Sequence, residues 1–238
     1  IMSPQSGGTI TADGVTGTVI GISTAQDLEN LAKLSKSNSF SGKTFVLTND
    51  IDLSSVSNWI GIGGDSYFAG SFDGQGHTIS NLSMTTASTS TTAAYAGLFT
   101  SANTGDIKNF TLKDATFNLT ANQDTGATFG AVVADGWAGT ISNVTVDNVT
   151  LNISGEAGCY GGIFGFGSKS IENCSVVGGN FNHEGSNGMY GGIVGRWGYA
   201  SATMSNCQSS LTINTNSAAY FGGLVGQLVD DMGNSNDF

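Results

Sequence analysis

The sequence has few charged residues and almost no basic ones. Only 11% of its 238 residues are Asp, Glu, Lys or Arg, and the net charge is −11, whereas about a quarter of an ordinary soluble domain is charged. Arg196 is the one arginine among seven basic residues. Binding of nucleic acid or of an anionic membrane surface needs clustered lysine and arginine. We therefore expect no nucleic-acid partner and no attraction to anionic membranes.

Long apolar runs, proline and cysteine are scarce as well. No stretch approaches the ~18 apolar residues of a membrane span, so we expect no membrane insertion. Pro4 is the one proline, and prolines therefore do not interrupt strand pairing. Three cysteines cannot all pair with each other and indicate no compartment. The chain begins at Ile1 without a signal peptide, which suggests a mature product or a fragment.

Glycine, serine, threonine and asparagine are abundant, and glycines and asparagines recur at a period of about 31 residues. In one series a glycine follows an aromatic residue and precedes two apolar ones, as in "YGGIF" and "YGGIV". The glycines of this series are Gly97, Gly130, Gly162, Gly192 and Gly223. A second series places an asparagine in strings such as "TISNVTV"; it consists of Asn81, Asn109, Asn143, Asn173 and Asn206. Two series with one mean period identify a repeat protein.

Each repeat contains short alternating runs such as "VTVDNVTLNI" (144–153), which are typical of strands. A unit of this length cannot bury its own apolar face, so neighbouring units stack and each strand pairs with its equivalent. We predict an all-β parallel β-helix with coils about 4.8 Å apart. The glycines would permit tight corners, and the asparagines would form a stacked ladder in a turn. A propeller is the competing interpretation, but its repeats usually have about 40 residues or more.

The N-terminal part predicts a cap for this stack. Residues 23–37 place Leu28, Leu31 and Leu34 on one helical face, after an N-cap at Ser23 or Thr24. We expect a short amphipathic helix at about 24–36 to cover the open apolar end. The whole chain, 1–238, is then a single domain, made of a cap (1–42), first coils (43–90), repeats (91–227) and a C-terminal tail (228–238) without a comparable cap.

Several segments resemble the GLUG-motif proteins of bacterial surfaces and secretomes: "AQDLENLAKL", "FVLTNDIDLSS", "WIGIGG" and "FAGSFDGQGHTISNL". The motif itself is matched best by "GGIFGFG", "GGIVGRWG" and "GGLVGQL", and the resemblance covers about residues 18–227. It implies a right-handed parallel β-helix on large exported proteins, including non-catalytic regions of some IgA-protease-like peptidases. In that family the motif marks architecture, so no catalytic residue carries over.

Acidic residues are the first candidates for chemistry. Asp50 and Asp52 share one face of a predicted strand, and Asp65 and Asp73 follow. Paired carboxylates can hold calcium or hydrolyse glycosides. Because lyases of acidic polysaccharides need basic residues, and Arg196 lies far along the chain, we expect no catalytic residues. Asp50 and Asp52 stay weak candidates for Ca²⁺, and no other cofactor is expected.

Two histidines give no stronger signal. His77, between a turn and a strand, could act as a base beside Asp73. The resemblance to GLUG-motif proteins, in which this string forms a corner into the next coil, implies a structural role instead. The string "HEGSN" (183–187) lacks the second histidine of a zinc-peptidase motif.

Aromatic residues in turns give the remaining binding candidates. Trp137, Trp197 and Tyr199 follow the repeat glycines at similar spacing, so they could form an exposed strip for sugar stacking or protein docking. Packing under a loop is the alternative. Cys174 and Cys207 occupy equivalent positions of successive repeats and should stack, either as buried thiols or within bonding reach.

These features favour a non-catalytic extracellular β-helix that acts as a bacterial surface adhesin or rigid stalk. Its expected partners are glycans or proteins on a host or neighbouring cell. A self-assembling subunit of an extracellular filament, joined through open solenoid ends, is the first alternative. A carbohydrate-active enzyme is the second.

Overall fold

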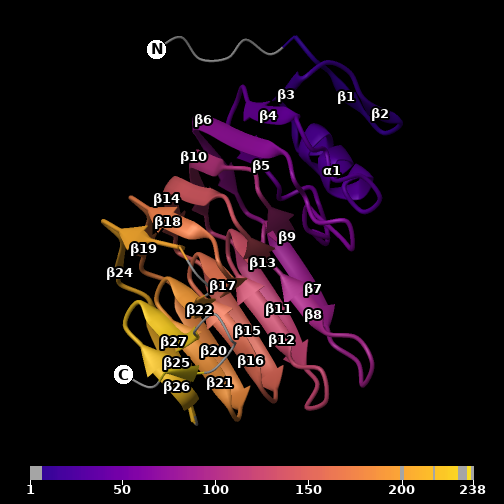
Figure 1. Cartoon of the computed structure of the whole chain (residues 1–238). Helices are drawn as coiled ribbons and strands as arrows, with labels where there is room; N and C mark the ends of the chain where they lie inside the picture. The colour runs from indigo at the N-terminus through magenta and orange to yellow at the C-terminus, as the bar shows by residue number, and fades with distance from the viewer. Residues whose placement is uncertain (1–6, 199–200, 217, 230–234, 237–238) are drawn as a thin grey trace.

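In a computed structural model the chain forms a stack of parallel strands in four sheets, running from the N-terminus at one end to the C-terminus at the other (Figure 1). The structure describes residues 7–198, 201–216, 218–229 and 235–236. Equivalent strands of successive turns pair in parallel, mostly in register, as in Thr116↔Thr150 and Phe117↔Leu151. The prediction of an all-β parallel β-helix is confirmed.

Sheets I and II form the first two walls of each turn. The main path of sheet I contains β3 (Val19–Ile22), β4 (Thr44–Leu47), β6 (Ser71–Ser80), β10 (Ile107–Lys113), β14 (Thr140–Asp147), β18 (Ser170–Glu172) and β23 (Met204–Ser205). Three shorter strands extend it, β5 (Ile51–Asp52), β19 (Ser175–Val177) and β24 (Gln208–Ser209). Sheet II contains β7 (Ser83–Ala87), β11 (Thr116–Ala121), β15 (Thr150–Gly155), β20 (Asn180–Gly185) and β25 (Thr212–Thr215).

Sheets III and IV complete each turn. Sheet III contains β8 (Ala94–Ala96), β12 (Ala127–Gly130), β16 (Gly158–Gly161), β21 (Gly188–Gly191) and β26 (Ala218–Gly222). Sheet IV contains β9 (Phe99–Asn103), β13 (Val133–Trp137), β17 (Phe164–Gly167), β22 (Val194–Gly198), β27 (Val225–Val229) and β28 (Ser235–Asn236). β28 is antiparallel to β27, and the rest of the predicted tail lies outside the described residues.

The predicted helix is present at the N-terminal end of the stack, as α1 (Ala25–Leu34) (Figure 1). Thr24 is its N-cap, and the Thr24 and Asp27 side chains cap each other's backbone N–H groups. Leu28 and Leu31 are fully buried and belong to the same apolar core as the strands. A short antiparallel pair, β1 (Ile10–Thr11) and β2 (Gly14–Val15), lies next to the helix. Within the described residues, no helix is long and apolar enough to cross a membrane.

The glycine series needs a correction of one residue. The register pairs Gly130 with Gly161, Gly161 with Gly191, and Gly191 with Gly222. Gly162, Gly192 and Gly223 are therefore one position beyond the residues equivalent to Gly97 and Gly130. The slip arises because the second repeat has "FGA" where later repeats have "GG", so matching the glycine that precedes two apolar residues selects the wrong one of the pair.

The corner glycines are required by lack of space. Gly162 and Gly192 have ordinary negative φ angles, since neither is among the residues with positive φ. A Cβ on Gly162 would lie 2.3 Å from the carbonyl oxygen of Gly192, and one on Gly192 would lie 2.2 Å from that of Gly223. A corner can require glycine because φ is positive or because there is no room for a Cβ. At Gly162 and Gly192 the second reason applies.

Four of the five predicted asparagines form the expected column. Asn109, Asn143, Asn173 and Asn206 all have positive φ angles, of 63°, 52°, 52° and 51°. The Asn143 amide donates to Asn109 Oδ1 at 3.1 Å, and the Asn206 amide donates to Asn173 Oδ1 at 2.6 Å. Short amide side chains tolerate this left-handed conformation and bond across the turns.

Asn81 belongs to a different corner, and its place in the series is wrong. Its neighbour Ser80 pairs with Lys113, which sets Asn81 opposite Asp114. Asp114 and Asn148 continue this second column, also with positive φ, and the Asn148 amide donates to Asp114 Oδ1 at 2.7 Å. Two successive corners of these turns thus carry Asn or Asp residues with positive φ. A single asparagine series in the sequence could not tell these two corners apart.

Candidate binding cleft

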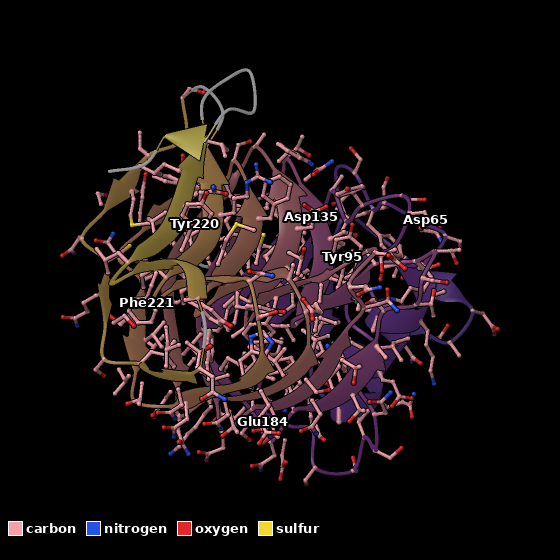
Figure 2. The ribbon with its side chains drawn as sticks, turned by 90° about the horizontal axis from the view of Figure 1, so that it is seen from below. Asp65, Tyr95, Asp135, Glu184, Tyr220 and Phe221 are labelled. Carbon is pink, nitrogen blue, oxygen red and sulfur yellow. The ribbon has the colours of Figure 1, made fainter. Side chains whose placement is uncertain are left out.

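A cleft of about 300 Å³ opens beside the first turns of sheets III and IV. Its lining consists of Gly64, Asp65, Tyr67, Tyr95, Thr100, Ser101 and Asp135. These residues come from the loop before β6, from β8 and β9, and from β13 one turn further along. Figure 2 shows Tyr95 and Asp135 close together, with Asp65 further along the solenoid. None of these described lining residues is basic.

Asp135 is the buried acid of the cleft. It lies on β13 in register with Ser101 of β9 and Phe166 of β17, and it is 5% exposed. The Tyr67 hydroxyl donates to Asp135 Oδ2 at 2.7 Å. Burial raises the pKa of Asp135, and hydrogen bonds from Tyr67 and from the Gly136 backbone oppose the rise. The site thus holds a largely desolvated carboxylate in one orientation.

Tyr67 positions that carboxylate through its hydroxyl group. Burial and the neighbouring Asp135 raise its pKa to about 12, while a hydrogen bond with the Trp137 side chain acts in the other direction. Tyr67 has a φ of 47°, a conformation uncommon for bulky residues. Such backbone strain often accompanies a functional loop. The hydroxyl therefore remains protonated and links Trp137 to Asp135.

The loop that carries Tyr67 is anchored to the capping helix. Lys36, just beyond α1, donates through Nζ to the carbonyl oxygens of Ile60, Gly61 and Gly63, at 3.0, 2.7 and 2.6 Å. Ser101 Oγ donates to the Gly64 carbonyl oxygen at 2.8 Å. The N-terminal cap thus fixes one rim of the cleft as well as closing the core.

Tyr95 supplies an accessible aromatic ring. It is 42% exposed, and burial with the nearby Asp135 raises its pKa. Carboxylates accept hydrogen bonds from sugar hydroxyls, and aromatic rings present a flat apolar face that can stack on a sugar ring. A buried carboxylate and an exposed tyrosine in a cleft without lining bases favour a neutral polyhydroxylated ligand.

Of the predicted acidic candidates, Asp65 lies in the lining of this cleft, whereas Asp50, Asp52 and Asp73 do not. Asp50 accepts from the Thr78 backbone and from His77 Nδ1, both of which lower its pKa. Asp52 accepts from the Asn81 amide at 3.0 Å and from the Ser54 backbone at 2.9 Å, and these bonds lower its pKa. Their oxygens therefore serve the fold. In the described part of the chain, no three His, Cys, Asp or Glu side chains gather as a metal site would require.

His77 also has a different partner from the one considered. Its Nδ1 lies 3.1 Å from Asp50 Oδ1, whereas Asp73 accepts from the Gln75 backbone and the Asn109 amide. The hypothesis that His77 acts as a base beside Asp73 is therefore wrong. His77 instead joins two successive turns of sheet I.

The predicted aromatic strip does not form. Trp197 pairs with Gly167, and Gly167 pairs with Gly136. Trp137 is therefore one residue beyond the position equivalent to Trp197, and the two side chains face opposite sides of the sheet. Trp197 packs against the core and donates its indole N–H to the Lys169 carbonyl oxygen at 2.9 Å. Trp137 packs on Phe166 and contacts Tyr67 at the cleft. Tyr199 lies outside the described residues.

Asp135, Tyr67 and Tyr95 were not predicted, although two of them leave a signal in the sequence. The register places Ala96, not Tyr95, in the inward column of Phe129 and Tyr160. Matching Gly97 of "YAGLF" with Gly130 of "TFGAV" already sets Ala96 opposite Phe129, and so turns Tyr95 outward. At the position of Asp135, later turns carry Phe166, Arg196 and Gln227, so this turn alone has an acid there.

Replacing Asp135 by asparagine should change how stability depends on pH. Because burial raises the pKa of Asp135 above its ordinary value of 3.8, the unfolded chain loses this proton first as pH rises. The free energy of unfolding then falls with rising pH until the folded chain also loses the proton. Asparagine removes this contribution and keeps an oxygen for Tyr67. The stability of the variant relative to the wild type, from urea unfolding at pH 3 to 8, should rise with pH; a difference independent of pH would contradict the assignment.

Comparison with known proteins gives a fold relationship. No protein-family model matches the chain, and no curated protein matches its sequence. Among solved structures, the chain is similar to one described as a "putative immunoglobulin A1 protease from Bacteroides ovatus", with a TM-score of 0.61 and 19% sequence identity. The match covers 92% of this chain and 78% of the other. At this identity the likeness shows the β-helical fold alone.

Proposed function

We propose that this chain is a non-catalytic extracellular β-solenoid that binds a neutral glycan in the cleft formed by Asp135, Tyr67 and Tyr95. The observation that carries the proposal is the buried Asp135 carboxylate, held by the Tyr67 hydroxyl at 2.7 Å beside the 42% exposed Tyr95 ring. The remaining turns act as a rigid stalk. The cleft volume of about 300 Å³ limits the bound part of the ligand to one or two sugar rings.

An extracellular location is supported by the composition of the surface. A column of asparagines, one on each strand of sheet II from β11 to β25, runs along the exposed side; the amides of Asn152, Asn182 and Asn214 each donate to the preceding asparagine at 2.9–3.1 Å. Charged residues make up only 11% of the chain. The resemblance to GLUG-motif proteins supports the same location on a bacterial surface, as an adhesin whose partners are glycans or surface proteins of other cells.

Replacing Tyr95 by alanine should weaken glycan binding about tenfold. A stacked aromatic ring contributes roughly 0.5–1.5 kcal/mol in addition to the free energy gained by burying its surface. A glycan array would identify a neutral oligosaccharide, and calorimetry would measure its dissociation constant. Tyr220→Ala is the matched control, since Tyr220 occupies the same column four turns away.

Equal losses of affinity in the two tyrosine variants would place the ligand elsewhere on the solenoid. If no glycan binds at high concentration, the stalk role alone remains.

Oligosaccharide hydrolysis is the second candidate. It is favoured by the raised pKa of the buried Asp135, a property of general acids, and by the second carboxylate, Asp65, in the same cleft. Chromatography of the bound oligosaccharide after prolonged incubation would separate the two candidates. Shortened products that disappear in Asp135→Asn would establish an enzyme, and an unchanged ligand would support simple binding.

A further inference from the structure

Cys174 and Cys207 lie directly opposite each other on adjacent turns. The residues before them pair as Glu172↔Ser205, and the residues after them pair as Ser175↔Gln208. Neighbouring strands of a sheet are about 4.8 Å apart. This spacing falls within the Cα–Cα range of roughly 4.4–6.8 Å that disulfides span. The backbone therefore sets the two cysteines at bonding separation.

The two sulfur atoms have equivalent surroundings. Cys174 Sγ lies 3.3 Å from the Glu172 carbonyl oxygen, and Cys207 Sγ lies 3.3 Å from that of Ser205. Each Sγ also lies 3.6 Å from a carbonyl oxygen of the preceding turn. Cys207 Sγ is thus directed toward the turn that contains Cys174, and the two thiols interact directly.

Solvent reaches only one of the pair. Cys174 is fully buried, whereas Cys207 is half-buried and lines an open pocket of about 200 Å³ with Asn173, Ser175, Asn206 and Gln208. Interaction with Cys174 lowers the pKa of Cys207 to about 7, and the same interaction raises the pKa of Cys174. Cys159 is different, because burial raises its pKa to about 11.

We propose that Cys207 and Cys174 form a two-thiol redox site that closes a disulfide between successive turns of sheet I. The oxidant is a small disulfide such as oxidised glutathione. The Cys207 thiolate attacks one of its sulfurs, the S–S bond breaks, and one glutathione thiolate leaves. Cys174 then gives up its proton and attacks the Cys207 sulfur, which expels the second glutathione. The two cysteines lose two electrons, and the glutathione disulfide gains them.

The bond would fasten the least buried turn of the solenoid to its neighbour. Leu211 and Ile213 are only partly buried, and Phe221 is 60% exposed. A cross-link restricts the open states of the segment it closes, so the last described turn should open less often. The inference is independent of glycan binding, whose cleft lies among the first turns.

The test uses the full chain, reduced and then incubated with oxidised glutathione at pH 8. After free thiols are alkylated, peptide mass spectrometry should find Cys174 joined to Cys207, and Cys159 alkylated. In Cys174→Ser the reaction should stop at a stable glutathione adduct on Cys207. Cys207→Ser should give neither product, and Cys159→Ser is the matched control that should behave as the wild type. Hydrogen exchange in 204–215 should slow several-fold on oxidation and recover on reduction.

Three results would overturn the proposal. They are a lasting glutathione adduct on wild-type Cys207 with Cys174 still free, modification of Cys159 as fast as that of Cys207, and a disulfide between two chains. A parallel reaction in denaturant, where all three thiols should react alike, shows whether the selectivity comes from the fold.

Discussion

Replacing Gly162 by alanine is expected to lower the free energy of unfolding by about 3 kcal/mol, the upper part of the usual range for an overpacked core. The new Cβ would lie 2.3 Å from the Gly192 carbonyl oxygen and 2.7 Å from Val176 Cγ2. The first of these atoms is backbone, so relief requires adjacent turns to move apart. Denaturant titration would measure the loss.

Gly223→Ala is the matched control for this change. Gly223 has the same position in the last described turn, yet a Cβ there would meet nothing within 4 Å. Its replacement should therefore be nearly neutral. The stability of a solenoid is roughly a sum over units and their interfaces, so hydrogen exchange should show protection lost from the altered turns toward the C-terminus. Equal effects at the two glycines, or uniform loss along the chain, would contradict the stacked-turn explanation.

The repeat made the architecture predictable from the sequence. Strand periodicity, the glycine and asparagine series and the cap of α1 each specify local structure, and stacking is the arrangement that lets these elements bury their apolar faces. The register between successive turns was harder to predict from the sequence. The glycine series slipped by one residue at Gly130, and Asn81 was assigned to the wrong corner, because two corners of each turn accept the same residue type.

The cleft could not be predicted in the same way, because it departs from the repeat. Tyr67 belongs to a loop before the regular turns, and its contact with Asp135 joins residues 68 apart in sequence. Periodicity reports what successive turns share, whereas this contact depends on one irregular loop and on the lysine that anchors it. The tryptophans were misassigned for a related reason. A shift of one residue in register reverses the face of the sheet to which a side chain points.

Replacing Phe129 by alanine should cost about 3–5 kcal/mol, as expected for a buried phenylalanine. Phe129 is fully buried, and its ring centroid lies 4.8 Å from that of Phe117 and 5.4 Å from that of Phe181. Alanine would leave a cavity between sheets II and III that the neighbouring turns cannot close without losing their strand pairing. Denaturant unfolding would measure the effect, with circular dichroism to confirm that the variant still folds.

The matched control for Phe129 lies in the same column. Phe221 occupies the equivalent position in the last described turn, but it is 60% exposed (Figure 2). Phe221→Ala should change stability by no more than about 0.5 kcal/mol, as at most surface positions. A larger loss that grows with protein concentration would mean that a second copy covers Phe221. Because α1 and the β1–β2 pair cover the opposite end of the stack, such a contact would join two C-terminal turns across a two-fold axis. An assembly of that kind closes as a dimer, so even this outcome would argue against a head-to-tail filament.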